Sequence, residues 1–471
     1  VLARFILRRL ELAGTDLSTL YAVNSAGAVV GVVICGFVLI GAVGIHITVA
    51  LAVAGNLLLG LIAWIASRRL SEAQTSAQLD NATDADTVTT PEKFHPQPTW
   101  LLLLFALFLS GMTSFAYEIY WTRSLVFLLG NSTYALSTML TAFIAGIALG
   151  SYLSRLLIDR DIDRVALFGW IQISIAIASA LALPLLFAAV DPQGLRQWLG
   201  EATDEVGLLF AGRFAVALLV MLLPATLIGA TFPLVGRIAV VDLDRAGSRI
   251  GTVYAANTLG NVVGALLPGF VLLYWLGIQR GILLMAVINV LLGLGFLGAR
   301  LGRRRYLRWA MPGAAAAALA VFVLLPIDFQ FPSENETPRH EVLYYRDGPT
   351  ATTRVTVDPT RGAKEMAIDG IVIGGNTFTE YKQLLLAHLP KLLLDDVSSE
   401  LSIGFGTGML AGESLRYARV DRLTCVEIEP SVIEAASHFA DLNHRVLSNP
   451  RLRLVLDDAS NYLRVTCLLY T

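Results

Sequence analysis

Long apolar runs constrain the fold of this chain more than any other feature. Segments of about 18–27 residues, enough to cross the hydrocarbon core of a bilayer, lie at about 21–43, 47–67, 100–121, 134–157, 164–190, 206–231, 253–276, 280–299 and 309–326. Only 15% of the residues are charged, whereas soluble domains contain about a quarter. The sequence therefore predicts a multi-pass integral protein of the plasma (inner) membrane, with the lipid bilayer as a partner.

The chain also repeats itself at a constant offset of 233 residues. The segment 20–31, Leu-Tyr-Ala-Val-Asn-Ser-Ala-Gly-Ala-Val-Val-Gly, aligns with 253–264, Val-Tyr-Ala-Ala-Asn-Thr-Leu-Gly-Asn-Val-Val-Gly. The match continues to Gly36 over Gly269 and Asn56 over Asn289. Parallel duplication of six-helix units is typical of major-facilitator-like transporters. We therefore expect 1–70 to hold the last two helices of a first unit, 100–299 to hold a second unit, and the chain to be truncated at its N-terminus.

The rest of the chain divides by composition. A polar linker is expected at 71–99, and a basic loop with an extra transmembrane helix at 300–328. A β cap with its connecting helix is expected at 329–395, with a tight turn at Asp369-Gly370. An α/β core follows at 396–471. Pro224 and Pro233 predict that the sixth span is kinked and continues into a shorter interfacial helix.

Arginine clusters set the orientation of the helices. Arginines lie at 4, 8 and 9, at 68–69, at 155, 160 and 164, at 237, 245 and 249, and between 300 and 308. If the nine spans alternate, every cluster falls on one side, which is cytoplasmic by the positive-inside rule. This orientation places the segment 330–471 on the opposite side.

The stretch Leu401 to Met409, Leu-Ser-Ile-Gly-Phe-Gly-Thr-Gly-Met, predicts a strand, a turn and a helix over 410–418. The glycines at 404, 406 and 408 permit positive φ, and they let main-chain N–H groups approach a ligand. Taken alone, a three-glycine turn is a weak signal for a nucleotide site.

Two acids strengthen the nucleotide hypothesis, because each ends a predicted strand. Glu427 follows Gly406 by 21 residues, the spacing at which a carboxylate accepts hydrogen bonds from both hydroxyls of a ribose. Asp458 follows the apolar run 452–456 and is expected to accept a hydrogen bond from an adenine amino group. Gly404, Gly406, Gly408, Glu427 and Asp458 together predict a nucleoside-type ligand.

Other patterns carry little chemistry. The three cysteines have no metal-ligand or disulfide spacing, so no metal is expected. The net charge of −2 gives no reason to expect nucleic acid. Inside the spans, Glu118 and Arg213 are expected either to neutralise each other or to reach the membrane interface.

Several motifs resemble spermidine synthases, and more closely the membrane-fused group in which a synthase-like domain follows a multi-spanning region. They are Leu343-Tyr-Tyr-Arg-Asp-Gly-Pro-Thr-Ala-Thr, His388-Leu-Pro, the 404–408 turn, Val426-Glu-Ile-Glu-Pro-Ser-Val-Ile and Asp458-Ala-Ser-Asn-Tyr-Leu. The resemblance implies a partial Rossmann-like domain of the class I methyltransferase type. It also implies decarboxylated S-adenosylmethionine as co-substrate, aminopropyl transfer to a polyamine, and a homodimer formed through this domain.

The departures from that family concern the amine. The resemblance places an Asp where this chain has Thr407, and a Tyr-(His/Gln)-Glu where it has Lys382-Gln383-Leu384, so that only Gln383 fits as a substrate-binding residue. The family's catalytic Asp belongs to a further strand, so no catalytic residue is assigned. We expect a chain truncated at its C-terminus as well, and inactive in this form.

Three functions remain open at this point. The first is a membrane-anchored aminopropyltransferase-like enzyme acting on a small-molecule amine. The second is a transporter whose soluble domain senses a nucleoside. The third is an S-adenosylmethionine-dependent methyltransferase, which Thr407 makes plausible. Polyamines and decarboxylated S-adenosylmethionine are made inside cells, so the charge rule conflicts with the first reading.

Overall fold

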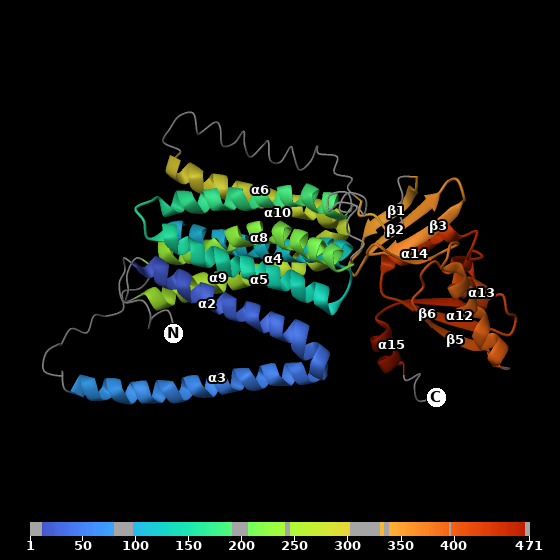
Figure 1. Ribbon diagram of the computed structural model, residues 1–471, viewed down its shortest axis with the longest axis horizontal. Helices are drawn as coiled ribbons and strands as arrows, with labels where there is room; N and C mark the ends of the chain where they lie inside the picture. The colour runs from blue at the N-terminus through green and yellow to red at the C-terminus, as the bar shows by residue number, and fades with distance from the viewer. Residues whose placement is uncertain are drawn as a thin grey trace.

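The computed structural model describes residues 12–79, 98–190, 206–240, 245–301, 330–333, 339–394 and 397–466. A bundle of long helices is followed by an α/β domain at one end of the bundle (Figure 1). The helices of the bundle are α2 (Ala13–Val33), the π-helical η2 (Ile34–Leu39), α3 (Ile40–Leu79), α4 (Pro98–Leu129), α5 (Thr133–Ile158), α6 (Arg164–Val190), α8 (Val206–Ala239), α9 (Ala246–Leu267), the π-helical η3 (Pro268–Leu272) and α10 (Leu273–Leu301).

Among the described residues, six helical segments are long and apolar enough to cross a membrane. Two of them, Ala13–Ile65 and Ala246–Gly298, contain 53 residues each, and each is broken by a left-handed glycine, Gly44 (φ 77°) or Gly277 (φ 69°). Counted on either side of these breaks, the helices coincide with eight of the nine predicted spans. The ninth, at 309–326, lies outside the described residues. Helix α3 reaches Leu79, inside the segment expected to be a linker.

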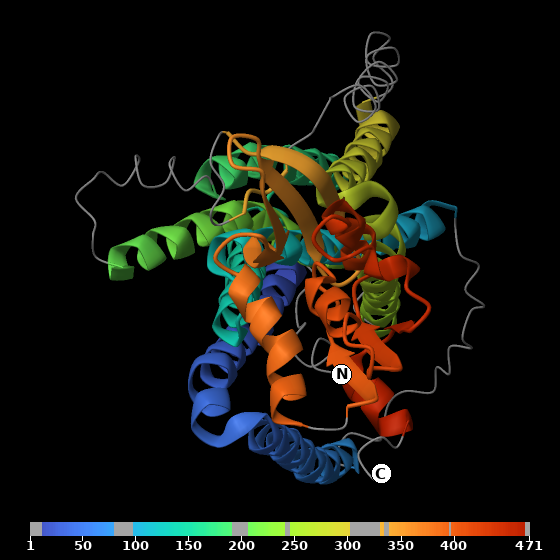
Figure 2. The ribbon, with the colours of Figure 1, turned by 90° about the vertical axis from the view of Figure 1, so that its right-hand side faces the viewer.

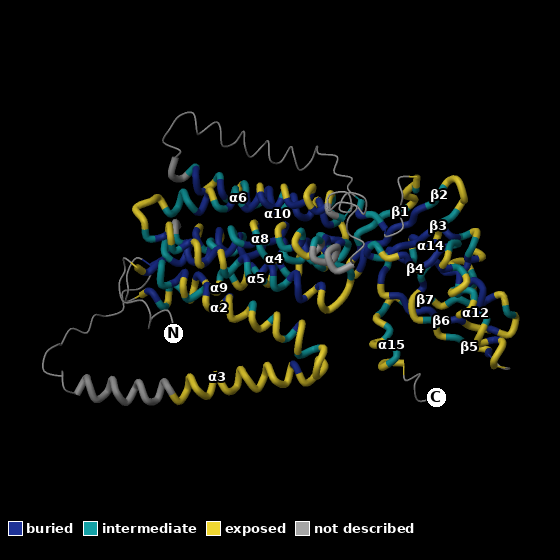
Figure 3. The backbone as a smooth tube through the Cα atoms, in the orientation of Figure 1, coloured by how far each residue is buried: buried dark blue, intermediate teal, exposed yellow. Residues whose placement is uncertain are grey.

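The sequence repeat reappears in the backbone. Helices α2 and α9 begin at the repeat mates Ala13 and Ala246, and each runs into a π-helical turn before its left-handed glycine. Gly44 and Gly277 are themselves repeat mates. The two copies differ in burial: 6% of the residues are buried in an 18-residue apolar window of Ala13–Ile65, compared with 56% in such a window of Ala246–Gly298. Figure 3 shows α3 exposed over most of its described length.

Helix α8 corrects one expectation. It is continuous from Val206 to Ala239 with both Pro224 and Pro233 inside it, so the predicted separate interfacial helix is wrong. Glycines allow the backbone of this helix to approach that of α5 closely. A Cβ on Gly150 would lie 1.8 Å from the carbonyl oxygen of Thr226, and one on Gly229 would lie 2.2 Å from that of Ile147. Such backbone contact fixes the course of α8 past its prolines.

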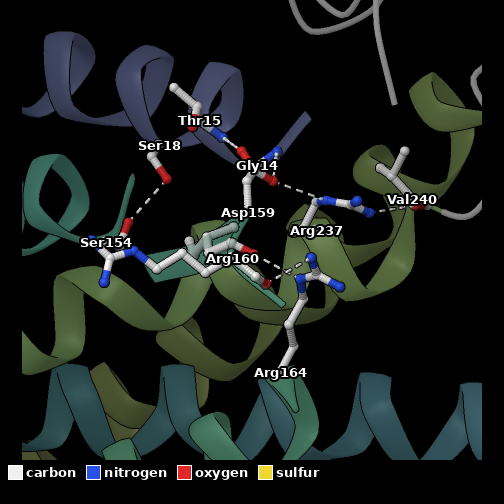
Figure 4. Close-up of polar contacts among 10 residues, drawn as sticks. Gly14, Thr15, Ser18, Ser154, Asp159, Arg160, Arg164, Arg237 and Val240 are labelled. Carbon is white, nitrogen blue, oxygen red and sulfur yellow. Dashed lines mark hydrogen bonds and ion pairs between the residues drawn. The ribbon is translucent and has the colours of Figure 1, made fainter. Parts of the chain in front are cut away.

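Asp159, in the turn between α5 and α6, joins three helices (Figure 4). Its carboxylate accepts hydrogen bonds from the backbone N–H groups of Gly14 (3.2 Å) and Thr15 (2.7 Å) at the start of α2. It also pairs with the Nε of Arg237 in α8 at 3.2 Å. Negative charge at a helix N-terminus is favourable, so this residue anchors α2 to the bundle.

The α/β domain has two sheets. An antiparallel cap has the order β1 (Glu341–Asp347), β2 (Thr352–Asp358), β3 (Ala363–Ile368) and β4 (Ile371–Gly375). The predicted turn between β3 and β4 is confirmed, with Asp369 (φ 50°) and Gly370 (φ 85°) both left-handed. A parallel sheet, β5 (Ser399–Ile403), β6 (Arg422–Glu427) and β7 (Leu452–Leu456), follows helix α12 (Glu380–Leu393). In Figure 2 this domain faces the viewer.

Three short helices accompany the parallel sheet: α13 (Met409–Ser414), α14 (Pro430–Ala436) and α15 (Ala459–Val465). Helix α13 is shorter than the helix predicted over 410–418, because the chain turns after Ser414. A shared core that includes Val355, Met366, Phe405, Cys425 and Phe439 joins the cap to this sheet. Burial of its thiol raises the pKa of Cys425 to about 12, so it behaves as an apolar core residue.

We predict that Asp159→Asn lowers the stability of the bundle by about 1–3 kcal/mol, because the substitution removes a charged acceptor and leaves the Nε of Arg237 without its ion-pair partner. The thermal unfolding midpoint in detergent micelles measures this change. Asp161→Asn is the matched control, since Asp161 is exposed on the same turn. An equal midpoint for the two variants would show that Asp159 does not anchor α2.

Candidate functional site

The glycine turn after β5 exposes bare backbone. Gly404 (φ 84°), Gly406 (φ 53°) and Gly408 (φ 77°) are all left-handed, which strongly favours glycine. A Cβ on Gly404 would meet no described heavy atom within 4 Å, and one on Gly406 would only reach Ile373 at 4.0 Å. Gly408 differs, because its Cβ would lie 3.0–3.1 Å from the side chains of Phe405, Asn443 and Val446. Two of the three predicted glycines therefore face open space, and the third is needed for packing.

Glu427 lies directly behind this turn. It is 7% exposed, and its Oε2 accepts a hydrogen bond from the backbone N–H of Phe405 at 2.8 Å. Its Oε1 accepts two more, from the N–H groups of Ile428 (2.8 Å) and Glu429 (2.9 Å). A carboxylate offers about four acceptor positions. Three are filled here, so one acceptor position remains free on Oε2, whereas the predicted grip on both hydroxyls of a ribose needs a free position on each oxygen.

Asp458 ends the neighbouring strand and is exposed. One of its oxygens, Oδ1, accepts a hydrogen bond from the N–H of Asn461 at 3.0 Å and so caps helix α15. Asp457 supports this turn by accepting from the N–H of Asp458 at 2.8 Å. The second oxygen of Asp458 has no hydrogen-bond partner in the part of the chain that the structure describes, which leaves it available to a donor.

Backbone hydrogen bonds hold the three strand ends together. The N–H of Gly404 donates to the carbonyl of Val426 at 2.8 Å, and that of Asp457 donates to the carbonyl of Glu427 at 3.1 Å. The glycine turn, Glu427 and Asp458 therefore follow consecutive strands at the carboxyl edge of one parallel sheet. In open α/β sheets ligands bind at this edge.

Thr407 and Gln383 bind each other. Thr407 is fully buried in the turn, and its Oγ1 donates to Oε1 of Gln383 on α12 at 2.5 Å. Gly374 of β4 packs against the same pair, since its Cβ would lie 2.9 Å from Thr407 and 3.0 Å from Nε2 of Gln383. That Nε2 is buried and has no hydrogen-bond partner among the described residues. This side of the turn thus presents a neutral donor rather than a carboxylate.

Glu429, which the sequence did not single out, holds the loop 348–351 next to Glu427. It is 1% exposed and accepts from the N–H and Oγ1 of Thr350 (2.9 and 2.6 Å) and from the N–H of Ala351 (2.9 Å). It also accepts from the N–H and Oγ of Ser431, at 3.1 and 2.7 Å, and so caps α14. The Glu-Pro-Ser sequence, a capping acid before proline at the first helical position, is the signal that identifies it.

The loop held by Glu429 also contacts the bundle. Arg123 of α4 donates to the carbonyl oxygens of Gly348 (3.1 Å) and Thr350. Asp347 accepts from the N–H of Ile278 in α10 at 2.9 Å. Contacts therefore run from α4, through the loop 348–351 and Glu429, to Glu427 and the glycine turn.

The charge of Glu429 is stabilised in place. Burial by itself raises the pKa of this carboxyl, but hydrogen bonds from Thr350 and Ser431 outweigh burial and hold the pKa below its ordinary value. Glu429 is therefore ionised near neutral pH.

Comparisons with known proteins address the same region. The family model described as "Spermine/spermidine synthase domain" matches residues 379–467. A polyamine aminopropyltransferase of Corynebacterium efficiens is 28% identical over 390 residues, which cover 78% of this chain and 67% of the relative. Polyamine aminopropyltransferase 2 of Streptomyces coelicolor is 27% identical over 383 residues, covering 78% and 65%. The chain thus spans about two thirds of the length of these relatives.

Among solved structures, the spermidine synthase of Thermotoga maritima is 26% identical, with a TM-score of 0.25, and the match covers 26% of this chain and 43% of that one. The sequence matches to the curated relatives are longer than the α/β domain and therefore extend into the helical region. Together, the family model and the curated relatives support a relationship to the spermidine synthase-like, polyamine aminopropyltransferase family.

We predict that Glu429→Gln destabilises the α/β domain by about 1–3 kcal/mol, because an amide replaces an ionised acceptor that receives several donors. Since folding lowers the pKa of Glu429, its ionised form contributes stability above the ordinary value of 4.5, and that contribution is lost as the pH falls below 4.5. Thermal unfolding of both proteins should differ most near neutral pH and converge in acid.

Asp421→Asn, an exposed carboxylate of the same domain, is the control for this comparison. A difference between Glu429→Gln and the unmodified chain that stays constant down to about pH 3 would contradict a role for the charge.

Proposed function

We propose that this protein binds decarboxylated S-adenosylmethionine at the carboxyl edge of the parallel sheet and transfers its aminopropyl group to a polyamine. The observation that carries the proposal is the open backbone of Gly404 and Gly406, with a free acceptor position on Glu427 beside it. The matching family model and the names of the relatives support the reaction class.

Each residue has a defined task in this proposal. The backbone of Gly404 and Gly406 lies beneath the nucleoside, Oε2 of Glu427 accepts a ribose hydroxyl, and the free oxygen of Asp458 accepts from the adenine amino group. Gln383 lies where the amine substrate binds in this proposal. The acceptor amine attacks the carbon next to the sulfonium in line, so rate depends chiefly on positioning and on a base that takes the amine proton. We assign no base among the described residues.

We further propose an integral membrane location with the α/β domain outside the cytoplasm, so the polyamine and the nucleoside, which are made inside cells, must reach that side of the membrane before they react. Arg160 and Arg237 lie beside Asp159 (Figure 4), and Arg155 belongs to the last turn of α5, which ends next to Asp159. The α/β domain lies at the other end of the bundle (Figure 1), where it contacts Arg123 and Phe127 of α4. The positive-inside rule then places the arginine-rich end in the cytoplasm. A homodimer through the synthase-like domain stays a prediction.

One observation favours a methyltransferase on the same fold. The buried, unpaired N–H of Gln383 beside Thr407 suits a carboxylate better than an ammonium group. S-adenosylmethionine carries that carboxylate and its decarboxylated form lacks it. Tighter binding of S-adenosylmethionine in a competition titration would select this alternative.

A different observation favours transport. Polar side chains line the contact between α4, α6 and α10 inside the bundle: Ser110 accepts from Gln172 at 2.9 Å, and Thr113 donates to Asn289 at 2.9 Å. The Oε1 of Gln172 has no partner in the described part of the chain. The Glu118–Arg213 pair adds nothing here, because the side chain of Arg213 lies outside the described residues. Uptake of radiolabelled polyamine by proteoliposomes would support transport.

We predict that methylthioadenosine, the nucleoside product of aminopropyl transfer, binds the purified chain, and that Glu427→Gln weakens binding by about 10–100-fold. One hydrogen bond to a charged acceptor accounts for a loss of this size. Isothermal titration measures it, with Asp421→Asn as the control that should bind as the unmodified chain does. No heat from the unmodified chain at millimolar ligand would contradict the proposed function.

We also predict that a membrane-impermeant maleimide labels Asp421→Cys in intact cells of the expression host and does not label Arg160→Cys until the membrane is opened. Both positions are exposed, and they lie on the α/β domain and at the opposite end of the bundle. The unmodified chain gives the background from native cysteines. The reverse labelling pattern would place the domain in the cytoplasm.

A further inference from the structure

The repeated helices α2 and α9 use opposite faces. On α9, Gly260 and Gly264 are buried against α4: a Cβ on Gly260 would lie 2.0 Å from the carbonyl oxygen of Phe108, and one on Gly264 would lie 2.2 Å from that of Met112. The two backbones are in direct contact, which small residues permit and larger ones prevent. This contact is among the most extensive between helices of the bundle.

The same face of α2 is bare. The repeat mates of those glycines are Gly27 and Gly31, which are exposed, and a Cβ on either would meet no described heavy atom within 4 Å. Asn24 is exposed beside them, whereas its mate Asn257 lies against α4 with its carbonyl oxygen 2.7 Å from the Cβ position of Gly111. Helix α2 thus carries the same small residues that pack on α4 in the second copy, but no described helix packs against them.

The opposite face shows the reverse. Helix α2 packs on α5 through a hydrogen bond between Ser18 and Ser154 at 2.9 Å. The contact continues into η2 through Gly36, whose Cβ would lie 2.0 Å from Oγ of Ser137. Gly269, the repeat mate of Gly36, lies in η3, which follows α9, and a Cβ there would meet nothing described within 4 Å. Each copy therefore has one occupied face and one bare face, and the two faces are exchanged between the copies.

The repeats also meet at a common point. Tyr21 of α2 and its mate Tyr254 of α9 both contact Phe232 of α8. The ring centroid of Phe232 lies 4.9 Å from that of Tyr21 and 5.9 Å from that of Tyr254. The bare faces of α2 and α9 thus belong to two helices that are joined through one side chain.

We propose that the bare faces of α2 and α9 together bind one apolar helical hairpin, whose first helix has the packing face of α4 and whose second has that of α5. The structure pairs α4 with α9 and α5 with α2. If α2 and α9 exchange roles, a helix that resembles α4 packs on α2 and a helix that resembles α5 packs on α9. Because α4 and α5 are consecutive, a single hairpin provides both helices. A second copy of the chain does not offer such a hairpin, because its α4 and α5 already pack on its own α9 and α2.

Residues 98–158 of this chain are the probe, since they carry both packing faces. Co-expressed with the full chain as a tagged hairpin carrying Ser154→Cys, they should form a disulfide with Gly251→Cys of the full chain. Gly251 is the repeat mate of Ser18, whose Oγ lies 2.9 Å from Oγ of Ser154, and a Cβ on Gly251 would meet no described heavy atom within 4 Å. The two cysteines therefore take the places of a side-chain pair that already fits, and a full chain without Gly251→Cys is the blank.

Leucine substitutions separate this proposal from non-specific contact between helices. Gly31→Leu should lower the disulfide yield about tenfold or more, and Gly269→Leu should lower it as well, because one hairpin spans both faces. Gly295→Leu is the matched control, since Gly295 is equally bare but lies on α10. Equal yields in all variants, no disulfide with the hairpin, or a disulfide-linked dimer of Gly251→Cys chains would each overturn the proposal.

Discussion

Two buried carboxylates, Glu427 and Glu429, hold the candidate site together. Both follow β6, and each is surrounded by backbone N–H donors that would otherwise be unpaired in the interior. Glu427 fixes the glycine turn, and Glu429 fixes the loop that Arg123 of the bundle also binds. Buried backbone N–H groups need an acceptor, so these two residues fix the geometry of the glycine turn and of the loop 348–351.

The bundle and the α/β domain are therefore in direct contact through hydrogen bonds. A short series of hydrogen bonds links Arg123 of α4, through the loop 348–351, Glu429 and Glu427, to the N–H of Phe405 in the glycine turn. Here the helical region supplies part of the scaffold for the site, whether or not it moves a solute itself.

Local patterns predicted much of this structure. Apolar runs located the helices, the Asp369-Gly370 pair located a hairpin, and three glycines located the turn, because each signal depends on neighbours in sequence. The continuous course of α8 past Pro224 was missed, since it depends on glycine contacts with α5. The role of Glu429 was missed for the same reason: its partners, Thr350 and Ala351, are distant in sequence.

Hydrogen–deuterium exchange at the turn tests the central claim most directly, because it reports on the backbone amides of Gly404 to Met409 themselves. With methylthioadenosine present, these amides and those of Asp458 to Asn461 should exchange more slowly, while the strands of the cap should be unchanged. Unaltered exchange at the turn under saturating nucleoside, or protection confined to the helical bundle, would show that this edge of the sheet is not where the ligand binds.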